Sequence, residues 1–149
     1  RNNPYLIHED LQKNMQYNVG IIRTKNEIKD GISEIDNLKS QFKDVKAPGT
    51  SQFNPGWHEA LALRNLLISA EAVSKSAFMR EESRGAHTRE DFPSEMKEWL
   101  EYNIINKKGK DGKMETIKVK RSEPEVELKR IANSSIEELE KEVKLDHNK

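Results

Sequence analysis

The sequence lacks cysteine altogether, and this absence excludes several kinds of site. Without a thiol the chain can form no disulfide, offers no thiolate nucleophile and cannot ligate an iron–sulfur cluster. A chain without cysteine also suits a reducing compartment. Long hydrophobic runs are missing too, because no apolar stretch approaches the roughly 20 residues that cross a bilayer, and there is no signal-peptide pattern. We therefore expect no membrane-spanning helix.

An excess of charge of one sign is also missing. The 26 Lys and Arg residues balance the 26 Asp and Glu residues, so no overall field draws the chain toward nucleic acid or an anionic membrane. Charged residues make up 35% of the chain and hydrophobic residues 34%, which is typical of thin helices with wide solvated faces. A length of 149 residues suits one domain. Because the chain begins at Arg1 rather than at methionine, we expect it to be processed or to be part of a longer protein.

Glycine is sparse, and other sequence patterns of catalytic sites are absent. The seven glycines never approach the spacing of a dinucleotide-binding G-x-G-x-x-G loop or of a P-loop. No G-x-S-x-G elbow is present, so hydrolytic catalysis is unsupported. The four histidines lie far apart in sequence without an H-x-x-x-H pair, which favours surface or capping roles over a zinc site. These histidines are His8, His58, His87 and His147.

The pattern that is present is helical. Asn3-Pro4 supplies an N-cap followed by a first-turn proline, and apolar residues recur at every fourth position from Ile7 to Val19. This spacing predicts a helix from Pro4 to Val19. Gly20 is expected to end it in the left-handed conformation that glycine adopts readily.

Two further helices are predicted downstream. Thr24 and Glu27 form a capping box before an apolar stripe, which predicts a helix over residues 24–45. Asn54-Pro55 repeats the cap-plus-proline start and predicts a longer helix that reaches about Glu82. We expect the apolar residues of each stripe to pack in a core. On the third helix they are Trp57, Ala60, Leu61, Leu63, Leu67, Ala70, Val73, Ala77 and Phe78.

The predicted elements favour an all-α fold. Three amphipathic helices with short connectors bury their stripes most simply as an elongated three-helix bundle over residues 1–83. Residues 84–122 of the same domain are expected to form a loop and a small β-hairpin, whose strands lie at 99–106 and 114–120 around an Asp-Gly turn. Residues 123–149 are highly charged, with weak helical stripes and a capping box at Ser135 and Glu138, and are predicted to be an exposed or partner-dependent helical tail.

The segment that leaves the third helix carries dense functional side chains. Arg84 and Arg89 provide two guanidinium forks, His87 lies between them, and Gly85 lets the backbone turn closely. Such a set could clamp carboxylates or backbone carbonyls bidentately. On chemistry alone, a solvated loop whose Arg and Glu side chains satisfy one another is an equally good interpretation.

The run ESRGAHTREDFP at residues 82–93 resembles the signature near the C-terminus of the flavoprotein subunits of succinate dehydrogenase and fumarate reductase. Upstream, the segments 11–15 and 19–23 resemble the opening helix of that family and its glycine break. The resemblance covers roughly residues 5–120, while the tail from about Arg121 departs from it. Further positions that follow in the family's order are Asn54, Ala70-Glu71, Ser76-Ala77, Arg80, Trp99 and Asp111-Gly112.

The resemblance implies a spectrin-repeat-like three-helix bundle that forms the C-terminal domain of such a subunit. The family interconverts succinate and fumarate with FAD, and passes electrons through an iron–sulfur subunit to quinone. Its FAD-binding and dicarboxylate-binding residues belong to segments absent here. The resemblance therefore implies that this chain contains no catalytic, cofactor-binding or metal-binding residue, binds no cofactor and is inactive alone.

The resemblance also implies where this domain makes contacts. Arg84, His87 and Arg89 are expected to dock the helical domain onto the flavin-binding domain and to support the groups that do so. The expected partners are that flavin-binding domain and the iron–sulfur subunit, with neither nucleic acid nor direct membrane insertion. The expected location is the cytoplasmic or matrix side, peripheral to a membrane through the parent complex.

Two alternatives stay open. L-aspartate oxidase shares the architecture, but its signature usually carries a bulkier residue at the place of Ala86 and an aromatic residue at that of Thr88. The residues here therefore favour the dehydrogenase. The second alternative is a free-standing helical interaction module, which a flavin fingerprint in the gene upstream of Arg1 would exclude.

Overall fold

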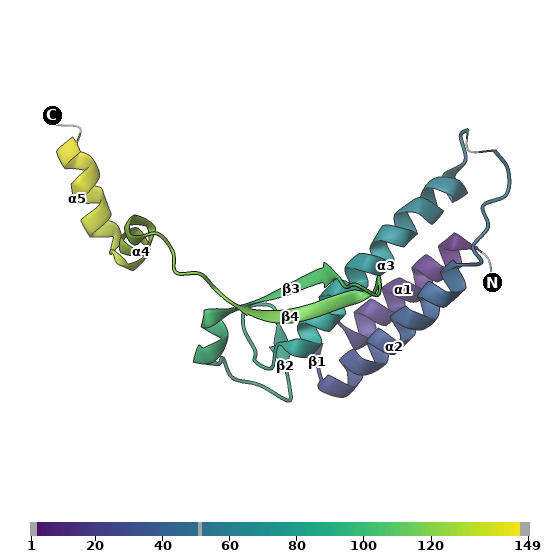
Figure 1. The fold of residues 1–149 in the computed structure, drawn as a ribbon, viewed down its shortest axis with the longest axis horizontal. Coiled ribbons are helices and arrows are strands. Elements are labelled where there is room, and N and C mark those ends of the chain that lie inside the picture. The colour runs from purple at the N-terminus through teal and green to yellow at the C-terminus, as the bar shows by residue number, and fades with distance from the viewer. Residues whose placement is uncertain (1–2, 51, 147–149) are drawn as a thin grey trace.

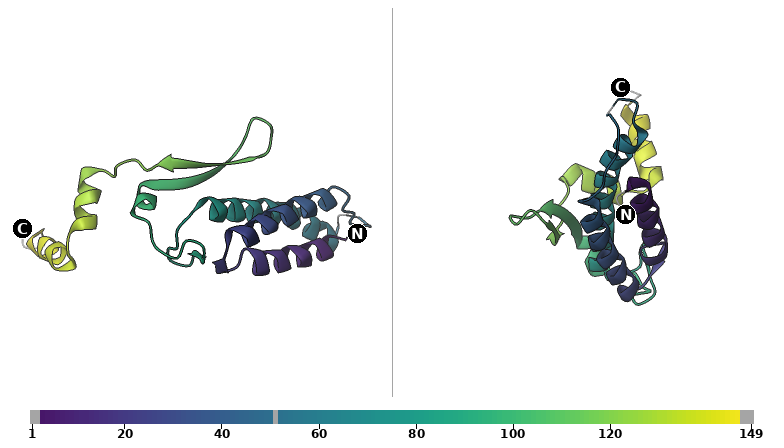
Figure 2. Two further views of the ribbon diagram at one scale, coloured as in Figure 1. Left: turned by 90° about the horizontal axis from the view of Figure 1, so that it is seen from below. Right: turned by 90° about the vertical axis from the view of Figure 1, so that its right-hand side faces the viewer.

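The computed structural model describes residues 3–50 and 52–146 (Figure 1). Three helices form a bundle, a two-stranded hairpin lies along the third helix, and two short C-terminal helices follow an extended segment (Figure 1). Both views of Figure 2 place the hairpin on one side of the bundle, next to the third helix. The predicted helical class with one small hairpin is confirmed.

The three bundle helices begin where the capping residues predicted. They are α1 (Pro4–Asn18), α2 (Lys25–Phe42) and α3 (Pro55–Met79). The side chains of Asn3 and Asn54 accept hydrogen bonds from backbone N–H groups of the first turns of α1 and α3. Thr24 and Glu27 form both bonds of the predicted capping box.

Two helices end earlier than predicted. α3 stops at Met79 rather than near Glu82, because Arg80 has an extended backbone with φ −81° and ψ 100°. α2 stops at Phe42, three residues before the predicted end. The prediction for Gly20 was also wrong, since it does not adopt a positive φ. A Cβ at this position would lie 2.7 Å from the carbonyl oxygen of Gln16, so a close approach of the chain to α1 explains the glycine.

The core is a continuous cluster between the three helices. Apart from Glu71, the buried positions on α3 are spaced alternately by four and three residues, the period of a helix seam that faces two neighbours. Ser74 continues this spacing and satisfies its hydroxyl within the helix, on the carbonyl of Ala70 at 2.8 Å. The cluster consists of Ile7, Leu11, Ile35, Leu38, Leu63, Leu67 and Ala70.

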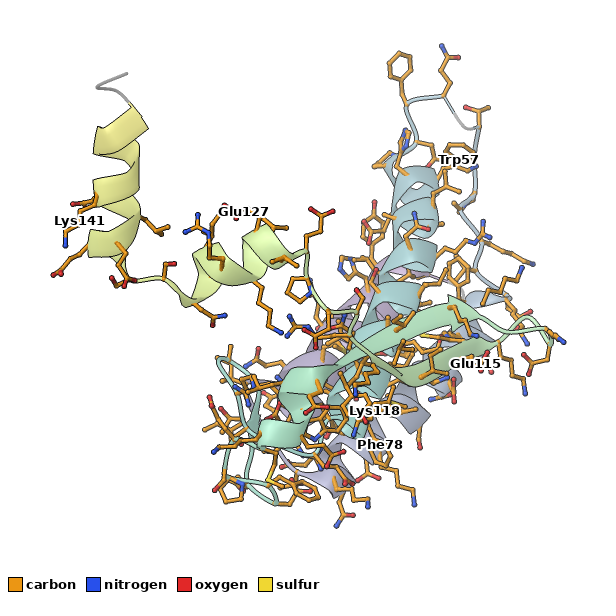
Figure 3. All side chains as sticks on the ribbon, turned by 60° about the vertical axis from the view of Figure 1, so that its left-hand side comes forward. Trp57, Phe78, Glu115, Lys118, Glu127 and Lys141 are labelled. Carbon is orange, nitrogen blue, oxygen red and sulfur yellow. The ribbon has the colours of Figure 1, made fainter. Side chains whose placement is uncertain are left out.

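Three residues that were predicted to pack in the core lie largely on the surface. Trp57 is 41% exposed, Leu61 49% and Val73 50%. They lie beside the buried seam of α3 rather than on it, so α1 and α2 do not cover them. Trp57 lies near the start of α3, and Phe78 near its other end (Figure 3). This leaves apolar side chains on the outer surface of the bundle.

A buried carboxylate joins the helices to one another. Glu71 on α3 accepts hydrogen bonds from Lys39 on α2 and from Lys75, the latter at 2.8 Å. Lys75 also donates to the carbonyl oxygen of Met114, at 3.1 Å, and so ties α3 to the hairpin. Burial alone would raise the pKa of Glu71, but the two lysines outweigh it and lower that pKa.

The short strands are β1 (Ile22–Arg23), β2 (Thr88–Arg89), β3 (Tyr102–Lys108) and β4 (Met114–Lys120). β1 and β2 pair in parallel, and β3 and β4 form the predicted antiparallel hairpin. The first hairpin strand begins three residues later than predicted, because residues Lys97–Glu101 form the 3-10 helix η1. In η1, Trp99 is buried between Arg80, 5.0 Å from the ring centroid, and Lys118, 4.2 Å from it.

The charged tail is helical, as predicted. It consists of α4 (Val126–Asn133) and α5 (Ile136–Asp146), and Ser135 and Glu138 form the expected capping box. No residue of α4 is buried, and the labelled Glu127 and Lys141 lie well away from the bundle (Figure 3). Within residues 3–50 and 52–146, no helix has the length and apolar content needed to cross a bilayer.

Candidate functional site

Residues 82–93, the signature segment, fold as an internally bonded loop at the end of α3. The Arg84 N–H donates to the carbonyl of His87 at 2.8 Å, and the His87 N–H donates back to that of Arg84 at 3.0 Å. Gly85 lies inside this tight turn with φ +57°, a conformation that disfavours any residue with a Cβ. The Ser83 hydroxyl donates to the Phe92 carbonyl at 2.8 Å and closes the loop from the other side.

A fully buried carboxylate holds this segment to the rest of the domain. The side chain of Glu82 is 0% exposed and accepts hydrogen bonds from Arg80, from Arg84 at 3.1 and 3.0 Å, and from the Met96 N–H at 2.9 Å. Burial raises the pKa of this carboxyl, but the donors from Arg84, Met96 and Arg80 outweigh burial and lower it to about 2. Arg84 extends outward from this pair and also contacts Glu95 at 3.0 Å.

Arg89 is fully buried and caps α3. Its guanidinium forms a two-pronged pair with Asp91, with both N–O distances 2.7 Å. The remaining Nη1 donates to the carbonyls of Ala77, Phe78 and Arg80 at 3.0–3.3 Å. Ala77 and Phe78 belong to the last turn of α3 and Arg80 directly follows it, so a cation here satisfies orphan acceptors and the negative end of the helix dipole.

The pairing of β1 with β2 brings together two segments that are far apart in sequence. The Thr88 N–H donates to the Ile21 carbonyl at 3.3 Å, and the Glu90 N–H donates to the Arg23 carbonyl at 3.1 Å. Asp91 also accepts from the Lys25 N–H at 3.2 Å, at the start of α2. The glycine break after α1 and the signature segment therefore form one structural unit, an arrangement that the sequence did not reveal.

His87 is half-buried beside three arginines. Its Nε2 lies 3.0 Å from the Arg80 carbonyl oxygen, so a neutral ring that donates from Nε2 leaves Nδ1 without a proton. Burial, and the nearby charges of Arg23, Arg89 and Arg80, lower the pKa of His87. The imidazole is therefore neutral at pH 7.

An open groove of about 720 Å³ lies between α3, β1, His87 and β3. Arg23, Arg80 and His87 supply its charged and titratable side chains, and none of the carboxylates that the structure describes lines it. Arg80 is paired with Glu82, but Arg23 forms no side-chain hydrogen bond or ion pair in the described part of the chain. The Nε of Arg23 is buried, and an unmade bond of this kind costs about 1–3 kcal/mol.

These side chains could bind an anionic or carbonyl group. Guanidinium groups and an imidazole recognise carboxylates and carbonyls. Of the described residues, no group of three or more His, Asp or Glu could hold a metal ion. His8 pairs with Glu59 and His58 meets the Trp57 ring edge-to-face, whereas His147 lies outside the described residues.

The sequence singled out Arg84, His87 and Arg89, and the structure brings all three into one loop. It did not single out two further residues of this region, Glu82 and Arg23. An available signal for Glu82 was its position between Arg80 and Arg84, two residues away on either side. Arg23 carried no such signal, because the contact between β1 and β2 depends on the folded bundle.

Comparison with known proteins gives one family and several named relatives. The family described as "Fumarate reductase flavoprotein C-term" matches residues 8–142. A fumarate reductase (CoM/CoB) subunit of Methanothermobacter marburgensis is 40% identical over 105 residues, which are 70% of this chain and 19% of that protein. The succinate dehydrogenase flavoprotein subunit of Rickettsia bellii is 38% identical over 96 residues, which are 63% of this chain and 16% of that protein.

A solved structure shares the same fold. Mycobacterium smegmatis Sdh1 in complex with UQ1 matches with a TM-score of 0.74 and 37% identity, over 82% of this chain and 20% of that one. The chain thus spans about a fifth of the length of the relatives that it matches.

Proposed function

Because this chain belongs to the family of fumarate reductase flavoprotein C-terminal domains, we propose that it braces the flavin-binding domain of a succinate dehydrogenase or fumarate reductase flavoprotein subunit. The family resemblance found in the signature segment is confirmed by the match over residues 8–142. The two relatives described above belong to a fumarate reductase and to a succinate dehydrogenase, and both enzymes are oxidoreductases.

The whole subunit is proposed to bind FAD and to interconvert succinate and fumarate. Its electrons would pass to an iron–sulfur subunit and from there to quinone, at the cytoplasmic or matrix surface of a membrane. Residues 3–50 and 52–146 supply none of the flavin chemistry in this proposal. The chain alone is proposed to bind no flavin and to be inactive, because its sequence has no glycine loop that could cradle a pyrophosphate.

Within the chain we propose three parts: the bundle at residues 1–83, the signature loop and hairpin at 84–122, and the tail at 123–149. The first two would act as one rigid docking body, because Glu82 and Arg89 bind the loop to the end of α3. The tail carries no buried residue in α4 and would serve a separate contact.

The observation that carries the docking role is the contrast between buried and open cations in the signature segment. Arg89 donates all its hydrogen bonds to groups within the domain and so holds the loop against the end of α3. Arg84 is held by Glu82 but remains partly exposed, and His87 lines the groove. Arg84 and His87 would therefore meet the flavin-binding domain, while Arg89 holds them in position.

Deletion of this domain from a flavoprotein subunit tests the proposal. The subunit is purified with and without the residues that match this chain, and its bound FAD and co-purifying iron–sulfur subunit are measured. We expect the shortened subunit to retain less of both. Unchanged FAD content and unchanged assembly would instead support a free-standing module.

A further inference from the structure

The groove beside the signature segment contains a cation without a partner. Arg23 lies on β1 with its Nε buried, and no acceptor in residues 3–50 or 52–146 reaches its guanidinium. Burial, and after it the charge of Arg89, lower the pKa of this guanidinium. An arginine held in a partly desolvated position among other cations would be stabilised by an anionic group.

The other members of the groove do not balance this charge. Arg80 is already paired with Glu82, and Arg89 is paired with Asp91. Asn103 and Asn106 on β3 are neutral, and the walls between them and α3 are mostly aliphatic, with Ala72, Val73, Ile104 and Ile105. A ligand that fits must therefore combine a negative charge with apolar neighbours.

We propose that this groove receives a carboxylate side chain, Asp or Glu, from the flavin-binding part of the same subunit, and that Arg23 is its anchor. A guanidinium fork matches the two oxygens of a carboxylate, and aliphatic walls suit the protein chain that carries it better than a free, fully hydrated anion. This proposal rests on the docking role proposed for the signature segment.

The choice of occupant follows from the size of the chain and from the lining of the groove. The relatives extend over about five times the length matched here, so in a subunit of that length the rest of the polypeptide would be present near this domain at high effective concentration. The groove is also lined by both segments that carry the family resemblance, through Arg23 and His87.

The test measures binding of this chain to the separately produced flavin-binding part of the subunit by isothermal titration calorimetry. Arg23→Gln removes the charge, Arg23→Lys keeps the charge but loses the fork, and Arg64→Gln is the matched control on the exposed surface of α3. We expect Arg23→Gln to raise Kd about 30-fold or more, as for loss of one partner of a desolvated charge pair. Arg23→Lys should be intermediate, and Arg64→Gln should bind like the wild type.

Folding and protonation provide independent checks. Because Arg23 makes no side-chain bond within the described chain and its buried Nε is unsatisfied, Arg23→Gln should not lower the melting temperature of the isolated chain. A carboxylate in the groove also favours the protonated imidazole, so the pKa of His87, followed by NMR, should rise on association. The charged groups that face His87 are Arg23 from β1, Arg80 from the end of α3 and Arg89 from β2.

The outcomes separate this inference from the proposed function. If the wild-type chain fails to bind, the docking role itself is wrong. If the wild type binds and Arg23→Gln binds equally well, docking holds and the carboxylate anchor is overturned. The carboxylate anchor would also be overturned if succinate alone shifted the Arg23 Nε–H resonance while Arg23→Gln had no effect on association. The groove would then bind a free carboxylate.

Discussion

Replacing Glu82 with glutamine isolates the contribution of one buried carboxylate to the signature segment. The substitution keeps the shape of the side chain but removes the charge that three donor groups share, namely Arg80, Arg84 and the Met96 N–H. The pKa of Glu82 is lowered to about 2 in the folded chain, from an ordinary value of 4.5. This difference corresponds to up to about 3 kcal/mol of stability at pH 7.

The sign of the pH dependence follows from the lowered pKa. The unfolded chain binds a proton at Glu82 near pH 4.5, while the folded chain does so only near pH 2. The stabilisation is therefore complete above pH 5 and is lost as the pH falls from 4.5 toward 2. At pH 3 the contribution of Glu82 should be about 1 kcal/mol, less than half of its value at pH 7.

Urea unfolding followed by circular dichroism measures this effect. We expect the free energy of unfolding of Glu82→Gln to be about 3 kcal/mol below that of the wild type at pH 7, with the gap narrowing toward pH 3. Glu95→Gln is the matched control, because Glu95 contacts Arg84 on the exposed surface, and it should cost less than about 1 kcal/mol. A Glu82→Gln variant as stable as the wild type, or a gap independent of pH, would refute the reasoning.

Three further substitutions and one ligand test probe other parts of the domain. Leu67→Ala should lower the free energy of unfolding by about 2–5 kcal/mol because Leu67 is buried in the core. The control Leu66→Ala, at an exposed position, should lower it by less than about 1 kcal/mol. Equal losses in the two variants would contradict the assigned seam. Arg89→Lys should lower the free energy of unfolding by about 3–5 kcal/mol, because a lysine cannot pair bidentately with Asp91 and also cap α3. A urea midpoint equal to that of the wild type would contradict this role of Arg89. Gly85→Ala should lower the free energy of unfolding by about 1–2 kcal/mol, because the positive φ disfavours alanine although the space around this position is open. An unchanged urea midpoint would show that the turn relaxes. The purified chain mixed with FAD should show no bound flavin after gel filtration, and a yellow protein would contradict this.

The starts of the bundle helices could be predicted from the sequence because their causes are local. Asn3, Thr24 and Asn54 are N-caps, and each contacts a backbone N–H two or three residues away. The ends were less predictable. The sequence has no proline or glycine between Met79 and Gly85 to mark where α3 ends. In the fold Arg80 turns away from the helix and contacts Glu82 and Trp99.

The core was predicted only in part. A 3.6-residue period identifies a broad apolar face of a helix, and the neighbouring helices cover only part of that face. Leu63 and Leu67 lie on the buried seam of α3, while Leu61 and Val73 lie beside it. Which of these positions face α1 and α2 depends on how the helices pack.

The candidate site was predicted as a set of residues but not as an arrangement. The density of Arg84, His87 and Arg89 in one glycine-containing loop is visible in the sequence. The partners that give each of them a role are not, since Arg89 contacts carbonyls 9 to 12 residues earlier and β2 pairs with β1 across more than 60 residues. Arg23 therefore became a candidate only in the folded structure.

Hydrogen–deuterium exchange of the chain, with and without the flavin-binding part of the subunit, tests the docking role most directly. The measurement compares the exchange rates of backbone amides along the whole domain in the two states. The docking role predicts slower exchange on association at residues 84–90 and at the groove segments 21–23 and 103–106. The docking role would be contradicted if the two parts associate while none of these segments is protected from exchange, or if protection is confined to the tail beyond residue 123.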